Sequence, residues 1–237
     1  MILLCRCALA GVVPSSSLQA ARRCLEARAL PLVVTDDLCG LAARSDGLLA
    51  QLAQSPSLTI VACHERAVRW LFHRAGAPLG DDATILDLRG TEEAQIVAHL
   101  ESLPAEPGQA PPPAPQFSDS WPPWFPVIDY SRCVACGQCV NFCLFGVYRA
   151  DADRRVQVVK AESCKNNCPA CARVCPKLAI IFPKYAEGPI SGLPVQPADE
   201  VQRDNFAGMS RDDILTALRK RGRKLLRPKD VQGGGHE

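Results

Sequence analysis

The sequences CVACGQCVNFC at residues 133–143 and CKNNCPACARVC at residues 164–175 decide the fold of this part of the chain. Each holds four cysteines, spaced Cys-x2-Cys-x2-Cys-x3-Cys in the first run and Cys-x3-Cys-x2-Cys-x3-Cys in the second. Thiolates two or three residues apart let a tight backbone loop wrap an iron–sulfur cluster and point its amides at the sulfides. A short apolar stretch follows each run, at residues 145–148 and 178–182. The sequence therefore predicts a duplicated unit with two [4Fe–4S] clusters.

Residues 127–183 resemble the bacterial-type ferredoxin family, whose members fold as a small α+β unit of paired strands and short helices. In that family the fourth cysteine of each run binds the cluster of the other run. The resemblance implies two ligand sets, which are Cys133, Cys136, Cys139 and Cys175 for one cluster, and Cys164, Cys168, Cys171 and Cys143 for the other.

The second run departs from the family pattern at one gap, and the first at the residue that follows it. Residues 165–167 make the first gap of the second run one residue longer, and Leu144 stands where the family has proline. A wider loop can absorb the extra residue. Lys165 would place positive charge near the sulfides, so we expect it to raise the potential of that cluster.

Zinc ribbons and disulfide frameworks are the other common uses of paired cysteines. Zinc ribbons usually separate two Cys-x2-Cys pairs by a long spacer, whereas here four cysteines are compressed into each run. The N-terminal apolar run is short and contains Arg6, so we predict neither an export signal nor a membrane span. The 13 cysteines are then expected to be reduced in the cytoplasm and used for metal.

Residues 1–102 alternate between short apolar runs and amphipathic segments. We predict strands at residues 2–5, 32–35, 58–62 and 84–88, and helices at residues 18–29, 46–53, 65–75 and 92–100. Four units, each a strand followed by a helix, predict a Rossmann-like α/β domain with a parallel sheet. Gly76 is expected to end the third helix, and Thr91 to cap the fourth.

The rest of the chain divides by composition. Eight prolines at positions 104–123 predict an extended linker at residues 103–126. The aromatic residues at its end, Trp121, Trp124 and Phe125, are expected to pack against the ferredoxin-like domain at residues 127–186. Residues 187–209 are predicted to be a second extended linker. A basic helical tail at residues 210–237 would begin with a capping box of Ser210 and Asp213.

Four of the five remaining cysteines fall where predicted strands end. Cys5 and Cys7 follow the first strand, Cys39 the second and Cys63 the third. Ligands bind at this edge of a parallel sheet, so these thiols are candidates for a third [4Fe–4S] cluster. The alternatives are inert buried thiols, a redox thiol pair, or a zinc site completed by His64. Cys24, in the first helix, is off this edge.

The early Cys-x-Cys, the turn at residues 37–40 and the segment at residues 61–67 resemble the N-terminal region of the flavoprotein subunit of heterodisulfide reductases. The resemblance implies a cluster-bearing domain that passes electrons onward. The chain has no Gly-x-Gly-x-x-Gly fingerprint of the kind that binds a flavin dinucleotide.

Composition and motifs narrow the function. The net charge of +2 does not indicate a nucleic-acid binder, and no catalytic constellation or phosphate-binding loop is recognisable. We therefore expect an iron–sulfur electron carrier that serves a larger oxidoreductase such as a flavoprotein, rather than an independent enzyme. The alternatives are an iron–sulfur subunit of a multi-subunit oxidoreductase whose N-terminal domain binds a third cluster or a small ligand, and a redox- or iron-sensing regulator.

Overall fold

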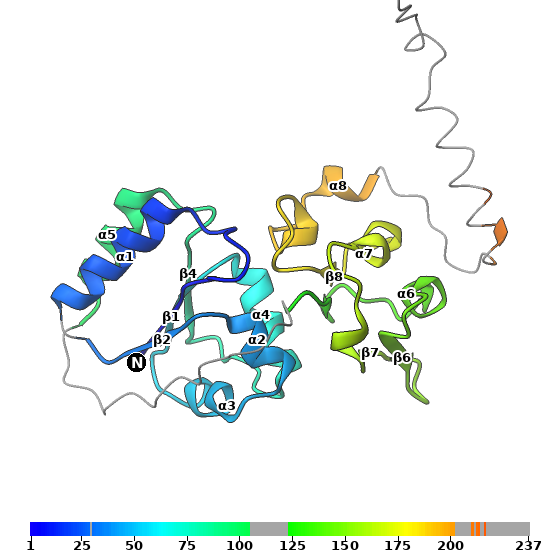
Figure 1. The fold of residues 1–237 in the computed structure, drawn as a ribbon, viewed down its shortest axis with the longest axis horizontal. Coiled ribbons are helices and arrows are strands. Elements are labelled where there is room, and N and C mark those ends of the chain that lie inside the picture. The colour runs from blue at the N-terminus through cyan, green and yellow to red at the C-terminus, as the bar shows by residue number, and fades with distance from the viewer. Residues whose placement is uncertain (29, 105–122, 202–209, 211, 214–215, 217–237) are drawn as a thin grey trace, which may run out of the picture.

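The N-terminal part of the chain is built on a parallel sheet. The computed structural model describes residues 1–28, 30–104, 123–201, 210, 212–213 and 216 (Figure 1). Four strands, β1 (Ile2–Cys5), β2 (Leu32–Thr35), β3 (Thr59–Ala62) and β4 (Thr84–Asp87), pair in the order β2-β1-β3-β4. All neighbours are parallel, and Leu3 in the first strand is in register with Val33 and Ile60.

Helices cover both faces of this sheet. The helices α1 (Ser15–Ala27) and α5 (Glu93–Ser102) pack together on one face, while α2 (Leu38–Ala43) and α4 (Glu65–Arg74) lie on the other, with α3 (Gly47–Ala53) beside α2 (Figure 1). Strands buried on both faces read as continuous apolar runs, as β1 and β3 do. The predicted parallel α/β domain is present.

Two details of this domain differ from the sequence prediction. The helix α2 was not predicted, because its six residues are too few for a helical period to show. The side chain of Asp37 caps it by accepting a hydrogen bond from Gly40 N at 2.9 Å. The N-cap of α5 is Glu92 rather than Thr91, whereas Gly76, at φ 77°, follows the end of α4 as predicted.

The second domain contains two small antiparallel sheets and two short helices. The strand β5 (Val127–Ile128) pairs with β8 (Ile180–Ile181), and β6 (Tyr148–Ala150) pairs with β7 (Val156–Val158). The helices α6 (Gln138–Phe142) and α7 (Ala170–Val174) pack against each other, and a 3-10 turn, η1 (Ala161–Ser163), precedes the second cysteine run. The apolar stretch after the first run begins its strand only at Tyr148, so Phe145 remains 44% exposed.

The core of the N-terminal domain continues into the second domain. Phe125, Val127 and Ile181 belong to the same buried cluster as the sheet residues. Trp124 stacks on Phe182, with ring centroids 5.2 Å apart, in the separate core of the second domain. Trp124 is therefore packed in the second domain as predicted, whereas Phe125 belongs to the cluster of the N-terminal sheet. Trp121 and residues 105–122 in general lie outside the described part of the chain.

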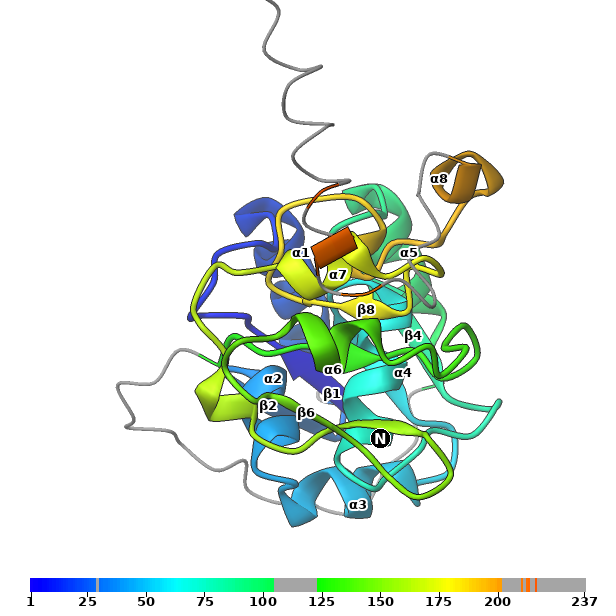
Figure 2. The same cartoon turned by 90° about the vertical axis from the view of Figure 1, so that its right-hand side faces the viewer.

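The second domain sits on the side of the sheet that carries α2 and α4, and Figure 2 shows its helices in front of them. Three arginines of the N-terminal domain donate to main-chain carbonyls of the second domain. Arg66 donates to Leu178 O at 2.5 Å and Pro189 O at 3.0 Å, and Arg74 to Val158 O at 3.0 Å. Arg89 donates to Pro183 O at 3.3 Å and Tyr185 O at 3.1 Å.

The C-terminal region differs from the expected extended linker. A 3-10 turn, η2 (Pro189–Ser191), and a short helix, α8 (Pro197–Val201), fall within it, and each begins with proline, which favours the first helical position. In the tail, Asp213 N donates to Ser210 Oγ at 3.2 Å and Ser210 N donates to Asp213 Oδ2 at 3.3 Å, the capping box that the sequence predicts. The basic residues after position 218 lie outside the described residues.

Candidate iron–sulfur centres

The first cavity of the second domain is lined by four cysteines, with apolar residues of β5 and β8 between them. These cysteines are Cys133, Cys136, Cys139 and Cys175. The loop that carries the first three turns through two left-handed residues, Ala135 at φ 52° and Gly137 at φ 72°. Such turns direct successive backbone N–H groups toward one point, which suits the sulfides of a cluster. Ala179 N also donates to Cys175 Sγ at 3.3 Å.

A second cavity, of about 250 Å³, is lined by the other four cysteines. These are Cys143, Cys164, Cys168 and Cys171. The additional residue in the gap between Cys164 and Cys168 is accommodated by Asn167, which adopts φ 58°. Asparagine tolerates this left-handed conformation better than most residues. Lys165 lines this cavity, so its positive charge lies beside these cysteines, as the sequence predicts.

The fourth cysteine of each run lines the cavity of the other run, because a short helix connects the two cavities. The helix α6 follows Gly137, contains Cys139, and ends before Cys143, whereas α7 contains Cys171 and ends before Cys175. Each helix thus extends from one cavity to the other. The thiols gather in the two sets of four that the resemblance implies.

Burial raises the pKa of Cys133, Cys139, Cys164 and Cys171, and this favours the protonated form of these four thiols when no metal is bound. Burial first, and then neighbouring thiols, raise the pKa of Cys164 to about 12. Burial also raises the pKa of Cys171 to about 12, and that of Cys139 is raised in the same way. A cation that replaces the protons removes this penalty. Four sulfur donors in an apolar cavity, with amides directed at them, fit an iron–sulfur cluster.

One residue that lines the second cavity could not be identified as a hydrogen-bond partner of a cysteine from its sequence context. Tyr148, at the start of β6 and only 7% exposed, donates its hydroxyl to Cys171 Sγ at 3.0 Å. In the sequence it belongs to an apolar stretch and looks like a core residue. Its contact depends on the pairing of β6 with β7 and on the position of α7, which the local pattern does not contain.

The comparisons with known proteins concern this same region. Residues 125–182 match the model of the 4Fe-4S dicluster domain family. This segment is a ferredoxin-type domain. An uncharacterized ferredoxin of Methanocaldococcus jannaschii is 48% identical over 61 residues, which are 25% of this chain and 41% of that protein. The chain thus spans less than half the length of this relative. No solved structure matches the chain.

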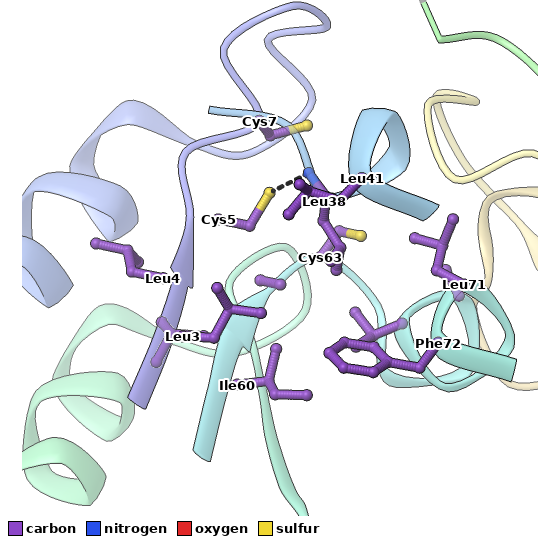
Figure 3. Close-up of a cluster of buried hydrophobic side chains, with 14 of the residues drawn as sticks. Leu3, Leu4, Cys5, Cys7, Leu38, Leu41, Ile60, Cys63, Leu71 and Phe72 are labelled. Carbon is purple, nitrogen blue, oxygen red and sulfur yellow. Dashed lines mark hydrogen bonds between the residues drawn. The ribbon is translucent and has the colours of Figure 1, made fainter. Parts of the chain in front are cut away.

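The N-terminal domain is not covered by these matches, and its likeness to the heterodisulfide reductase subunit stays a prediction. Cys5, Cys7, Cys39 and Cys63 lie together at the carboxyl edge of the sheet, and three of them are seen in Figure 3. Cys24 lies in α1 and is half-buried.

His64, considered above as a zinc ligand, has another partner. It occupies the N-cap position of α4, and its Nδ1 lies 2.7 Å from Asp87 Oδ2. Among the described residues, no group of three or more histidine, cysteine, aspartate and glutamate side chains is arranged to hold a single metal ion. In the same part of the chain, no helix is long and apolar enough to cross a membrane.

Proposed function

We propose that this protein carries single electrons between partner proteins through two [4Fe–4S] clusters in its ferredoxin-type domain. The observation that carries the proposal is the division of eight cysteines between two cavities, four to each. A cluster whose four irons are all held by cysteine has no site open for substrate, which favours electron transfer over catalysis. Each cluster would accept one electron and later release it, without breaking a bond.

The chain's own residues provide the rest of the mechanism. Cys139 in α6 and its C-cap Cys143 are four residues apart, about 6 Å of helical rise, and would ligate different clusters. A path this short favours rapid exchange of the electron between them. Backbone amides and the Tyr148 hydroxyl donate to the ligating sulfurs, and such hydrogen bonds stabilise the added negative charge of the reduced cluster.

The experiment is anaerobic purification of the full chain, with iron, acid-labile sulfide and zinc measured per chain. Cys136→Ser and Cys168→Ser each remove one proposed ligand, one from each cavity. We expect each variant to lose about four irons relative to the parent chain, and the dithionite-reduced parent to give electron paramagnetic resonance signals of reduced [4Fe–4S] clusters. Zinc in place of iron would refute the proposal.

Electron transfer itself needs a second measurement. The dithionite-reduced protein, freed of excess reductant, is mixed with a flavoprotein acceptor, and reoxidation of the clusters is followed by visible absorbance. We expect oxidation of the clusters to match the one-electron equivalents that appear in the acceptor. The partner is proposed to be such an oxidoreductase in the cytoplasm. Clusters that stay reduced with every acceptor of higher potential would contradict a carrier role.

A second candidate function is supported by a cleft between the domains. A cavity of about 580 Å³ lies where α4 begins and β4 ends, and it is lined by His64, Asp87, Thr91, Ser131 and Arg132 among others. Ligands of parallel α/β domains bind at this edge. The protein would then be an iron–sulfur subunit whose N-terminal domain binds a small polar ligand, and a metabolite retained on purification would favour this function over a simple carrier.

A further inference from the structure

Four cysteines from separate segments of the N-terminal domain converge at one edge of its sheet. Cys5 is the last residue of β1, Cys7 lies two residues beyond, Cys39 is in the first turn of α2, and Cys63 directly follows β3. Their exposed fractions are 5%, 7%, 6% and 7%, respectively. Figure 3 shows the sulfurs of Cys5, Cys7 and Cys63 around Leu38, at the carboxyl ends of the strands.

The four thiols are close enough to interact electrostatically. Burial and then the charge of Cys7 raise the pKa of Cys63 to about 12, and Cys7 and Cys63 act in the same direction on both Cys5 and Cys39. A single buried cysteine serves well as a small apolar residue. That role does not require four cysteines to meet at the one edge where ligands bind. A shared ligand does require it.

The backbone around these thiols has the same features as the loops of the ferredoxin-type domain. Leu38 N donates to Cys5 Sγ at 3.3 Å, and the backbone of Val12 acts to lower the pKa of the Cys7 thiol. Cys7 itself adopts φ 48°, a left-handed conformation that is uncommon for residues other than glycine. Ala135 and Asn167 have the same conformation beside the other cysteine cavities.

Positive charges from both domains face the thiols. Lys184, from the ferredoxin-type domain, pairs with Asp37, and their side chains are 6% and 1% exposed. Lys184 acts electrostatically on Cys7 and Cys39, and Arg89 acts on Cys7 and Cys63. Four thiolates around an iron–sulfur cluster give a net negative charge, and both cations act to offset it. Asp37 acts against Lys184 at Cys7 and Cys39, where the effect of the carboxylate is the larger, whereas Arg89 outweighs Asp87 at Cys63.

We propose that Cys5, Cys7, Cys39 and Cys63 bind a third iron–sulfur cluster in the N-terminal domain, beyond the two clusters of the proposed carrier function. The donor set is all sulfur, and His64, the nearest histidine in sequence, is engaged with Asp87. Thiolate-only sites suit iron–sulfur clusters, and zinc is the competing occupant that the experiment must distinguish. The cluster would exchange one electron with the ferredoxin-type domain, whose Lys184 contacts the site.

The experiment compares the full chain with two single variants after anaerobic reconstitution with ferrous iron and sulfide. The Cys63→Ser variant removes a proposed ligand, and Cys24→Ser is the matched control because it changes a cysteine of the same domain outside the site. We expect about twelve irons and twelve sulfides in the parent chain and in the control, and about eight of each in Cys63→Ser. Spin quantification after dithionite reduction should fall by about one third.

About eight irons in the parent chain, unchanged in Cys63→Ser, would overturn the proposal, and so would stoichiometric zinc that only Cys63→Ser loses. The parent measurement decides the question even if Cys63→Ser does not fold. The count also separates this proposal from the carrier function. A parent with about four irons, lost in Cys63→Ser but kept in Cys136→Ser and Cys168→Ser, would leave the third cluster standing and refute the other two.

Discussion

At the scale of single residues, the hydroxyl of Tyr148 is the clearest control on a cluster. The hydrogen bond from Tyr148 to Cys171 Sγ stabilises the reduced, more negative state of the proposed cluster in the second cavity. Tyr148→Phe removes this bond, so we expect it to lower the midpoint potential of that cluster. The expected shift is on the order of 50 mV, since 59 mV corresponds to about 1.4 kcal/mol for one electron. A potentiometric titration followed by electron paramagnetic resonance measures it.

Tyr185→Phe is the control for this prediction. Tyr185 also packs in the core of the second domain, but its hydroxyl accepts from Arg173 Nη2 at 3.2 Å. Its substitution should leave both potentials unchanged. Equal shifts in the two variants would mean that the change at Tyr148 acts through packing rather than through the sulfur.

A second prediction at this scale concerns Arg66, whose Nε lies 2.5 Å from the Asp129 carboxylate. The two side chains are 12% and 3% exposed. Arg66→Met leaves that carboxylate buried without its cation, which costs about 3–5 kcal/mol in the free energy of unfolding. Arg69→Met, on the same helix, breaks an exposed pair with Glu65 and long hydrogen bonds to Gly80 O and Ala83 O, and should cost less, about 1–2 kcal/mol. Anaerobic chemical denaturation compares them, and similar losses would contradict this assignment.

At the scale of elements, the approach of Gly192 to α4 limits how the two domains fit. A Cβ at Gly192, where φ is 110°, would lie 2.6 Å from Ala67 Cβ, whereas one at Gly188, where φ is 72°, meets nothing within 4 Å. Both substitutions to alanine strain the backbone, but only Gly192→Ala also forces α4 away. We expect it to destabilise the protein by about 1–3 kcal/mol more than Gly188→Ala in denaturant titrations. Equal losses of stability in the two variants would show that the contact between position 192 and Ala67 adjusts without an energetic penalty.

Elements with a strong local signal could be predicted from the sequence, and weakly encoded ones could not. The strands β1 and β2 begin and end at the predicted residues, because apolar runs between turns mark buried parallel strands. The helix α2 and the two-residue strand β8 are too short for periodicity to reveal their bounds. The prediction of an extended linker at residues 187–209 missed η2 and α8, because prolines that favour loops also open helices.

The candidate sites were predictable to the extent that spacing encodes them. Eight cysteines were identified by their two runs, and the convergence of the N-terminal four followed from the shared edge of a parallel sheet. The partners that shape their surroundings were not predictable. Lys184 is 147 residues from Asp37, and Arg66 is 112 residues from the carbonyl that it contacts at Leu178. No local pattern records such contacts.

At the scale of the whole molecule, the same arginine contacts predict that the two domains unfold together. Arg66, Arg74 and Arg89 bind carbonyls of the second domain, and the N-terminal core extends to Phe125 and Ile181. Buried, specific contacts of this kind couple two domains into one cooperative unit. Far-ultraviolet circular dichroism and the visible absorbance of the clusters should therefore lose their signals at one denaturant concentration, under anaerobic conditions.

The Arg66→Met and Arg89→Met double variant tests this coupling, since it removes most of the carbonyl contacts while leaving every cysteine in place. We expect its two transitions to separate, with cluster absorbance and circular dichroism no longer coincident. Separate transitions already in the parent chain would show that the domains are independent. The pairing of Lys184 with Asp37 would then not hold the ferredoxin-type domain in a fixed position beside the N-terminal thiols, so this measurement bears on the function as well as on the fold.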